Sequence, residues 1–187
     1  MLIGVPSETV AGEARVAVTP ETVKKLKALG HQLRIESGAG LAASVTDEAY
    51  VAVGAEISDA AGAWQADLLL KVRGPTEAET PWLRAGTTLV GMLNPFDSSG
   101  LQRLATAGVT AYALEAAPRT TRAQSMDVLS SQANIAGYKA VMIAANAYQR
   151  FFPMLMTAYG TSPHNVLPQI IYNTVTLALP LGLHDFD

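Results

Sequence analysis

The chain has 187 residues, enough for one well-packed domain with little left for a second. Its 13 basic and 16 acidic residues give a formal net charge of −3, and it carries no nucleic-acid-binding motif, so we expect no nucleic-acid partner. The sequence contains no cysteine, which excludes disulfides and thiolate chemistry and agrees with a cytoplasmic location.

The first third of the chain alternates between strands and helices. Residues 2–6 (LIGVP) predict a short apolar strand, and residues 31–37 alternate apolar and polar side chains as a second strand does. Between them, residues 19–30 predict a helix with Thr19 as its N-cap and a proline at the first helical position. Residues 46–55 predict another short helix with acidic residues in its first turn.

Three more strands follow, at residues 66–73, 86–93 and 109–115, with a helix over residues 99–108 before the last of them. We expect the strand at 66–73 to be fully buried. Five strands interleaved with helices predict an α/β fold: one parallel sheet in a single Rossmann-like layered domain with flanking helices.

The last third of the chain is mostly apolar. Residues 126–150 predict a long helix, rich in small residues, with a polar stripe along one face at Asp127, Ser131, Asn134 and Tyr138. Residues 151–183 contain no charged side chain, and residues 166–183 approach the ~20 apolar residues that span a bilayer. Polar side chains and prolines interrupt that segment, so we favour a buried or interfacial C-terminal apolar helix over a transmembrane one.

Ligands of parallel sheets bind at the carboxyl ends of the strands, and polar clusters follow several of the predicted strands. They lie at residues 6–15, 74–79, 94–97 and 118–132. In the first cluster, Glu8, Glu13 and Arg15 fit either a solvated loop with a surface ion pair or an arginine that binds a carboxylate or carboxamide. Spacing alone favours the solvated loop.

Two further patterns carry weaker signals. Residues 37–44 contain G-x-G-x-x-A after a strand, but the capping signal for the next helix comes several residues later, so we expect a plain loop and not a dinucleotide fingerprint. The three histidines, at positions 31, 164 and 184, are far apart and lack carboxylates at metal-ligand spacing, so we expect no metal site.

Three segments together resemble the N-terminal part of the NAD(P) transhydrogenase α subunit, which shares its fold with alanine dehydrogenase. They are IGVPSETVAGEARVAVTPETVKKLKALGH (3–31), ESGAGLAASVTDEAY (36–50) and RAQSMDVLSSQANIAGYKAV (122–141). The resemblance gives a domain over residues 1–161. Residues 162–187 are an unmatched apolar tail where the family continues into a nucleotide-binding domain with a glycine-rich phosphate turn.

In that family, the loop matched by Arg119, Gln124 and Asp127 reaches over the nicotinamide of NAD(H). Ser130 matches a residue that faces the same ring. The resemblance therefore implies hydride transfer between NAD(H) and NADP(H), coupled to proton translocation in the full complex, with Arg119, Gln124 and Asp127 as catalytic residues and all four as cofactor contacts. Such a reaction needs positioning and electrostatics more than a proton donor.

The resemblance also implies partners. NADP(H) would lie on a partner domain, the chain would form a homodimer, and membrane subunits would place it at the inner membrane as a peripheral protein. Without the nucleotide-binding domain, we expect this chain alone to be inactive and to bind NADH weakly or not at all.

Two other functions stay open. The chain could be a non-catalytic dimerisation or interaction module. It could also resemble alanine dehydrogenase in acting on a small 2-oxo acid, but that enzyme's pyruvate-binding lysine and catalytic histidine would fall at Arg73 and Asn94, and neither residue type is kept. Arg15 matches a position that is basic in both branches and so does not distinguish them.

Overall fold

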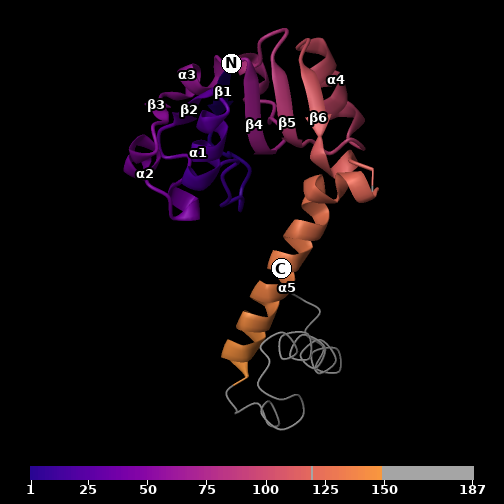
Figure 1. The fold of residues 1–187 in the computed structure, drawn as a ribbon. Helices are drawn as coiled ribbons and strands as arrows, with labels where there is room; N and C mark the ends of the chain where they lie inside the picture. The colour runs from indigo at the N-terminus through magenta and orange to yellow at the C-terminus, as the bar shows by residue number, and fades with distance from the viewer. Residues whose placement is uncertain (119, 149–187) are drawn as a thin grey trace. The chain divides into compact units, whose positions relative to one another are not determined.

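The computed structural model describes residues 1–118 and 120–148. These residues belong to two compact units, and the boundary along the chain lies between Asp127 and Val128. The first unit is a parallel sheet with strand order β3-β2-β1-β4-β5-β6 and helices between the strands (Figure 1). The strands are β1 (Leu2–Val5), β2 (Gln32–Glu36), β3 (Glu56–Ser58), β4 (Leu68–Arg73), β5 (Thr88–Met92) and β6 (Thr110–Ala113). The helices are α1 (Pro20–Ala28), α2 (Asp47–Ala52), α3 (Ala60–Trp64), α4 (Ser98–Thr106) and α5 (Val128–Ala147).

This architecture confirms the predicted single parallel sheet of a Rossmann-like α/β domain. All five predicted strands and the predicted helices up to residue 148 are present. The sequence missed β3 and α3, which are only three and five residues long. The predicted apolar tail, residues 162–187, lies outside the described residues.

Capping residues set where the helices begin. The Thr19 hydroxyl accepts a hydrogen bond from the backbone N–H of Thr22 at 3.3 Å, and Pro20 occupies the first helical position of α1. The Thr46 hydroxyl caps α2 in the same way by accepting from Ala49 N at 3.4 Å. Each cap satisfies a backbone donor that has no partner inside its own helix.

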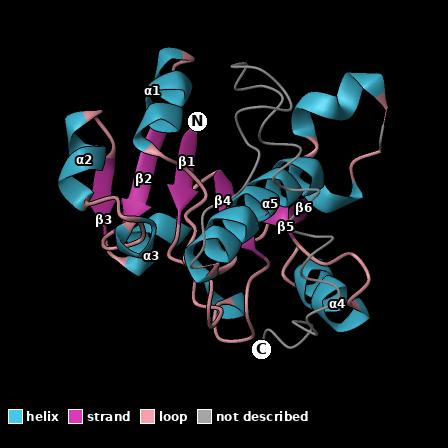
Figure 2. Cartoon of the chain, turned by 90° about the horizontal axis from the view of Figure 1, so that it is seen from below, coloured by secondary structure: helices cyan, strands magenta, loops and turns pink. Residues whose placement is uncertain are grey.

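Helices cover both faces of the sheet (Figure 2). On one face, Val23 of α1 and Tyr50 of α2 pack with Ile3 and Ile35 of the strands in one apolar cluster. On the other face, side chains of α3, α4, β4 and β5 form a second cluster: Trp64, Ala66, Leu69, Leu89, Leu93 and Leu104. Parallel sheets are ordinarily covered on both faces, because each crossover helix packs back on the strands.

The strand β4 is less buried than expected. Leu69 and Lys71 are buried, Leu68, Leu70 and Val72 are half-buried, and Arg73 is exposed. Successive side chains of a strand point to opposite faces, and only one face of β4 is fully covered within the described part of the chain. The prediction of a fully buried strand was wrong for this reason.

The helix α5 matches the long helix predicted over residues 126–150 and belongs to the second unit. Of the predicted polar stripe, Ser131, Asn134 and Tyr138 lie on α5, whereas Asp127 comes just before its first residue. None of the described side chains of α5 is buried. Among the described residues, no helix is both long enough and apolar enough to cross a membrane.

Candidate functional site

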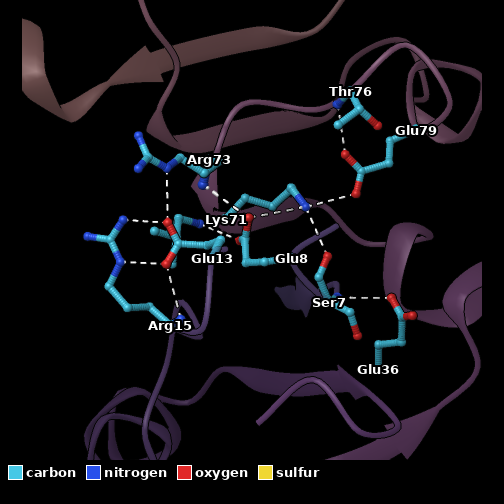
Figure 3. Close-up of polar contacts among 10 residues, drawn as sticks. Ser7, Glu8, Glu13, Arg15, Glu36, Lys71, Arg73, Thr76 and Glu79 are labelled. Carbon is cyan, nitrogen blue, oxygen red and sulfur yellow. Dashed lines mark hydrogen bonds and ion pairs between the residues drawn. The ribbon is translucent and has the colours of Figure 1, made fainter. Parts of the chain in front are cut away.

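The strand order changes direction at β1, which pairs with β2 on one side and with β4 on the other. At such a switch point, the loops that follow the two central strands leave in opposite directions and open a crevice at the carboxyl ends of the strands. In this chain, the loop after β1 (residues 6–15) meets the end of β4 there, and charged side chains from both fill the space (Figure 3).

Lys71 of β4 is the buried centre of this network and is only 3% exposed. Its ammonium group donates to the Ser7 carbonyl and to Glu79 Oε1, both at 3.0 Å, and Glu8 Oε2 lies 3.6 Å away. The same group also lies 5.4 Å from the centre of the Trp64 ring. The two carboxylates compensate the ammonium charge of Lys71, which would otherwise be costly to hold out of water.

Glu79 owes its ionised form to the same contacts. Burial by itself raises the pKa of a carboxyl group, but the backbone N–H of Thr76, which donates at 2.7 Å, and the Lys71 ammonium together outweigh it. The net effect lowers the pKa of Glu79. The Glu79 carboxyl group is therefore ionised near neutral pH, as its ion pair with Lys71 requires.

Glu8 joins the loop after β1 to the end of β4. Its two carboxylate oxygens accept from the backbone N–H groups of Val72 at 2.6 Å and Arg73 at 3.2 Å. The side chain is 3% exposed. The solvated loop favoured from the sequence was therefore wrong for Glu8, because the loop folds inward over the strand end.

Glu13 lies between two guanidinium groups. Its oxygens accept from Arg15 Nε at 2.6 Å and from Arg73 Nε at 2.9 Å, and the carboxylate is 5% exposed. The Arg15 hydrogen bonds, with a smaller contribution from Arg73, lower the pKa of Glu13 to about 2. The sequence predicted a surface ion pair in the cluster of Glu8, Glu13 and Arg15 without naming its members. Glu13 and Arg15 form such a pair, but it is more shielded than a surface pair.

The glycine-containing loop after β2 does not form a phosphate turn. Gly38 N donates to the Asp47 carboxylate at 2.9 Å, and the Ser37 hydroxyl donates to it at 2.7 Å. The segment that follows is a 3₁₀ turn at Leu41–Ala43, and α2 begins only at Asp47. The Asp47 carboxylate thus accepts a hydrogen bond from the amide that a phosphate would need. This contact confirms the prediction of a plain loop.

A second feature of the same edge is a cavity of about 270 Å³ between the ends of β4 and β5 and the first turns of α4. Arg73, Asn94 and Glu115 are among the residues that line it. Asn94 has a φ of +50°, a left-handed conformation that asparagine tolerates better than most residues, and its backbone N–H donates to Glu115 Oε1 at 2.6 Å. The carboxylate thus holds the loop after β5 at the cavity wall.

The four site residues predicted from the family resemblance lie beyond β6. Arg119 is outside the described residues. Gln124 is exposed in a 3₁₀ segment, Thr121–Met126, and its carbonyl accepts from the N–H of Asp127 at 3.3 Å, so these two residues share one turn. Ser130 is exposed on α5, in the second unit. The structure does not define where it lies relative to the other two.

Sequence reasoning did not single out Lys71 or Glu115, and it included Glu79 only as a member of the polar cluster at residues 74–79. For Lys71 a signal was available, because a lysine inside the otherwise apolar run LLLKV implies a buried charge with partners. Two of its partners, Ser7 and Glu8, are more than 60 residues away in the sequence, so local spacing could not name them.

Comparison with known proteins places the chain among a defined set of relatives. The family model described as "Alanine dehydrogenase/PNT, N-terminal domain" matches residues 4–136. The NAD(P) transhydrogenase subunit alpha of Cereibacter sphaeroides is 48% identical over 166 residues, which cover 87% of this chain and 32% of that protein. The alanine dehydrogenase of Bacillus subtilis is 36% identical over 152 residues, covering 80% of this chain and 39% of that protein.

A solved structure agrees with these sequence matches. The transhydrogenase from Sinorhizobium meliloti superposes with a TM-score of 0.78 at 46% sequence identity, covering 87% of this chain and 47% of that chain. The chain thus spans less than half the length of each of these three relatives.

Proposed function

The chain belongs to the family of N-terminal domains that alanine dehydrogenases share with transhydrogenases, and we propose that it forms the NAD(H)-facing part of a transhydrogenase α subunit. The observation that carries the proposal is the higher identity to the transhydrogenase subunit, 48% against 36% for an alanine dehydrogenase. In the complete assembly, hydride would pass between NAD(H) and NADP(H), and this transfer would be coupled to proton translocation.

The residues at the alanine dehydrogenase positions support the same choice. Asn94, which stands where that enzyme's catalytic histidine would fall, carries an amide that neither gains nor loses a proton near neutral pH. Arg73, at the position of the pyruvate-binding lysine, is already bonded to Glu13. Oxidation of an amino acid needs a group that accepts a proton, and this pair offers none.

The described residues fit one end of NAD(H) better than the other. Gln124 is exposed and carries both a donor and an acceptor, as a residue that orients a carboxamide must. The pyrophosphate has no matching site at the described strand ends, because the Gly38 amide is bonded to Asp47 and carboxylates fill the crevice beside β1. We infer that the nucleotide end binds to a domain outside residues 1–148.

The proposed roles follow from side-chain chemistry. NAD(H), when bound, supplies or accepts the hydride. Arg119 provides positive charge next to the ring, Gln124 holds the carboxamide, Asp127 and Ser130 fix the loop and the first turn of α5, and together they exclude water. None of these groups has to transfer a proton.

The proposed partners are an NADP(H)-binding domain and membrane subunits, which would place the chain at the inner membrane. A second copy of the chain is a further candidate. The helix α5 supports this, because its large apolar side chains Ile135, Met142 and Ile143 are each more than half exposed. Sedimentation equilibrium at micromolar concentration tests this proposal. A dimer is expected, and a monomer would contradict the proposed pairing of two copies.

The substitution Gln124→Ala tests the proposed function. In a complex reconstituted from this chain, a nucleotide-binding domain and an NADP(H)-binding partner, it should slow single-turnover hydride transfer far more than it weakens NADH binding, as expected for an interaction made mainly in the transition state. The free energy of unfolding of the isolated Gln124→Ala chain should differ from that of the unmodified chain by no more than roughly 0.5 kcal/mol, because Gln124 is an exposed loop residue.

The matched control is Gln102→Ala, which removes another exposed glutamine, from α4. It should leave both the transfer rate and NADH binding unchanged. A destabilised Gln124→Ala protein with an unchanged transfer rate would mean that the loop is structural, and the proposal would fail.

A further inference from the structure

The strand β6 forms one edge of the sheet and has a neighbouring strand, β5, on one side only (Figure 1). Thr110 N donates to Thr87 O at 3.0 Å, so the backbone groups of Thr110 point towards β5. Successive residues of a strand point their N–H and C=O groups to opposite sides, so those of Ala111 and Ala113 point away from β5. Within the described part of the chain, this edge therefore offers backbone donors and acceptors to a further strand.

The two edges of the sheet are protected to different degrees. At the other edge, β3 is three residues long and carries an exposed glutamate, Glu56. Short edge strands and charged side chains keep a sheet from pairing with another chain. β6 contains neither a proline nor a charged residue, and its first three residues are exposed. Residues 104–114 as a whole carry no charge. An exposed edge without such protection is suited to pairing with another strand.

Tyr112 adds a large apolar side chain to this edge. It is 58% exposed, although an aromatic side chain in a strand ordinarily packs against its neighbours. Val90 lies beside it on β5, and the described sheet has no strand on its other side. A strand added there would cover more of the ring, because side chains directly opposite each other on paired strands are in contact.

A second copy of β6 fits this edge under twofold symmetry. In an antiparallel pair centred on Tyr112, this residue lies opposite its own copy, and Ala111 lies opposite Ala113 of the other copy. The alanines then exchange the backbone hydrogen bonds, because their groups point outwards, and the tyrosines form the closer pair that exchanges none. No like charges meet in this register, and an aromatic pair across two strands stabilises a sheet.

We propose that β6 is a self-association edge, at which two copies of the chain pair in antiparallel orientation around Tyr112 and join their sheets into one. This inference rests on the homodimer of the proposed function and adds the place where the two copies touch. The assembly closes at two copies, because the twofold axis passes through the contact and the described sheet has one such edge.

The test is disulfide cross-linking, which the absence of cysteine from the chain makes direct. Tyr112→Cys gives each copy a single thiol, and the two thiols face each other at a non-hydrogen-bonded pair. The Cα atoms of such a pair are about 4.5 Å apart, within the range that a disulfide spans. Oxidation of the full-length variant by copper–phenanthroline at micromolar concentration should therefore give a covalent dimer.

Thr110→Cys is the matched control, because it changes an exposed residue of the same strand, two positions away. In the proposed register its two copies lie roughly 13 Å apart, beyond the reach of a disulfide. It should cross-link at least roughly tenfold more slowly than Tyr112→Cys, since only chance collisions bring its thiols together.

Tyr112→Cys also removes the tyrosine pair, so a second measurement uses the unmodified chain. Amide hydrogen exchange at Ala111 and Ala113 should be roughly tenfold slower in a dimeric sample than in one diluted until it is monomeric, because pairing bonds these outward-pointing groups. Protection that persists in the monomer would overturn the proposal, in favour of a segment of the same chain that covers the edge.

The cross-linking results distinguish the β6 contact from other contacts between two copies. Equal rates for Tyr112→Cys and Thr110→Cys would overturn the proposed register. A dimer in sedimentation equilibrium with neither a cross-link at Tyr112→Cys nor protection of Ala111 and Ala113 would overturn the β6 contact and keep the homodimer, with α5 as the next surface to test.

Neither measurement involves a nucleotide or hydride transfer, so their failure is separate from a failure of the proposed function. Sheets that do not join at β6 overturn this inference even if Gln124→Ala slows the reaction. A cross-link specific to Tyr112→Cys keeps it even if Gln124→Ala has no effect on the rate.

Discussion

The side chains around Glu13 show how far single residues can be predicted. The cluster of Glu8, Glu13 and Arg15 indicated an ion pair on this loop, and Glu13 and Arg15 do pair. The third partner, Arg73, is 60 residues away in the sequence and reaches Glu13 because β4 lies next to β1. Local sequence therefore indicated an ion pair on the loop, but the shielding of that pair depends on the strand order, which the sequence pattern did not specify.

The same residue gives a pH prediction. The pKa of Glu13 is about 2 in the folded chain, below the ordinary value of 4.5. The unfolded chain therefore binds the proton more readily, and the stability that Glu13 contributes is fully present above pH ~4.5 and is lost as the pH falls from there towards ~2. Glu13→Gln removes this contribution, so the gap in free energy of unfolding between the two proteins should narrow across that window.

Urea unfolding at several pH values between about 6 and 2 measures this gap. A gap that stays constant as the pH falls would contradict the assigned pKa. A gap that widens would mean that the carboxyl group is more easily protonated in the folded chain than in the unfolded one.

At the scale of elements, the predictions succeeded where helix caps and hydrophobic periodicity agreed. α1 has both a threonine cap and an apolar face, and its start was predicted to the residue. The strand β3 has no fully buried side chain and α3 contains Gly62 within five residues, so neither produces a periodic signal. Both form because neighbouring strands and helices pack against them, a tertiary effect that overrides weak local preference.

Gly91 of β5 provides a test of how closely these elements pack. A Cβ at this position would overlap the Lys71 carbonyl of β4, and backbone cannot move aside as a flexible side chain can. Gly91→Ala should therefore destabilise the first unit by about 1–3 kcal/mol in urea unfolding, the usual cost of overpacking. Gly137→Ala in α5 is the control: a Cβ there meets nothing within 4 Å, so it should cause no loss of stability. Equal stability of Gly91→Ala and the unmodified chain would show that the two strands can separate without cost.

At the scale of the molecule, the strand order decides which groups meet. The sequence predicted a parallel sheet, but the order β3-β2-β1-β4-β5-β6 brings the loop after β1 onto the end of β4, a pairing of segments about 60 residues apart. In a doubly wound sheet, this switch point is where a nucleotide would bind. Here Glu8, Glu13 and Glu79 place negative charge at the switch point. The nearby cations Lys71 and Arg73 form ion pairs with these carboxylates. The fold has the topology of a dinucleotide-binding domain, while the residues at its switch point oppose a pyrophosphate.

The last prediction follows from that opposition. We expect the 187-residue chain to show no saturable binding of NADH at micromolar concentration in titration calorimetry, because pyrophosphate contacts at a helix N-terminus supply a large share of dinucleotide affinity. The sequence offers Gly38 N as a candidate for such a contact, but this amide donates to Asp47 instead.

Adding ADP as a competitor identifies the cause if binding does occur. Micromolar NADH binding that ADP displaces would reveal a phosphate site within this chain, with residues 38–40 the first to substitute. Micromolar binding that ADP leaves unchanged would place the affinity at the nicotinamide end, and it would be tighter than the contacts proposed for Gln124 and its neighbours can account for.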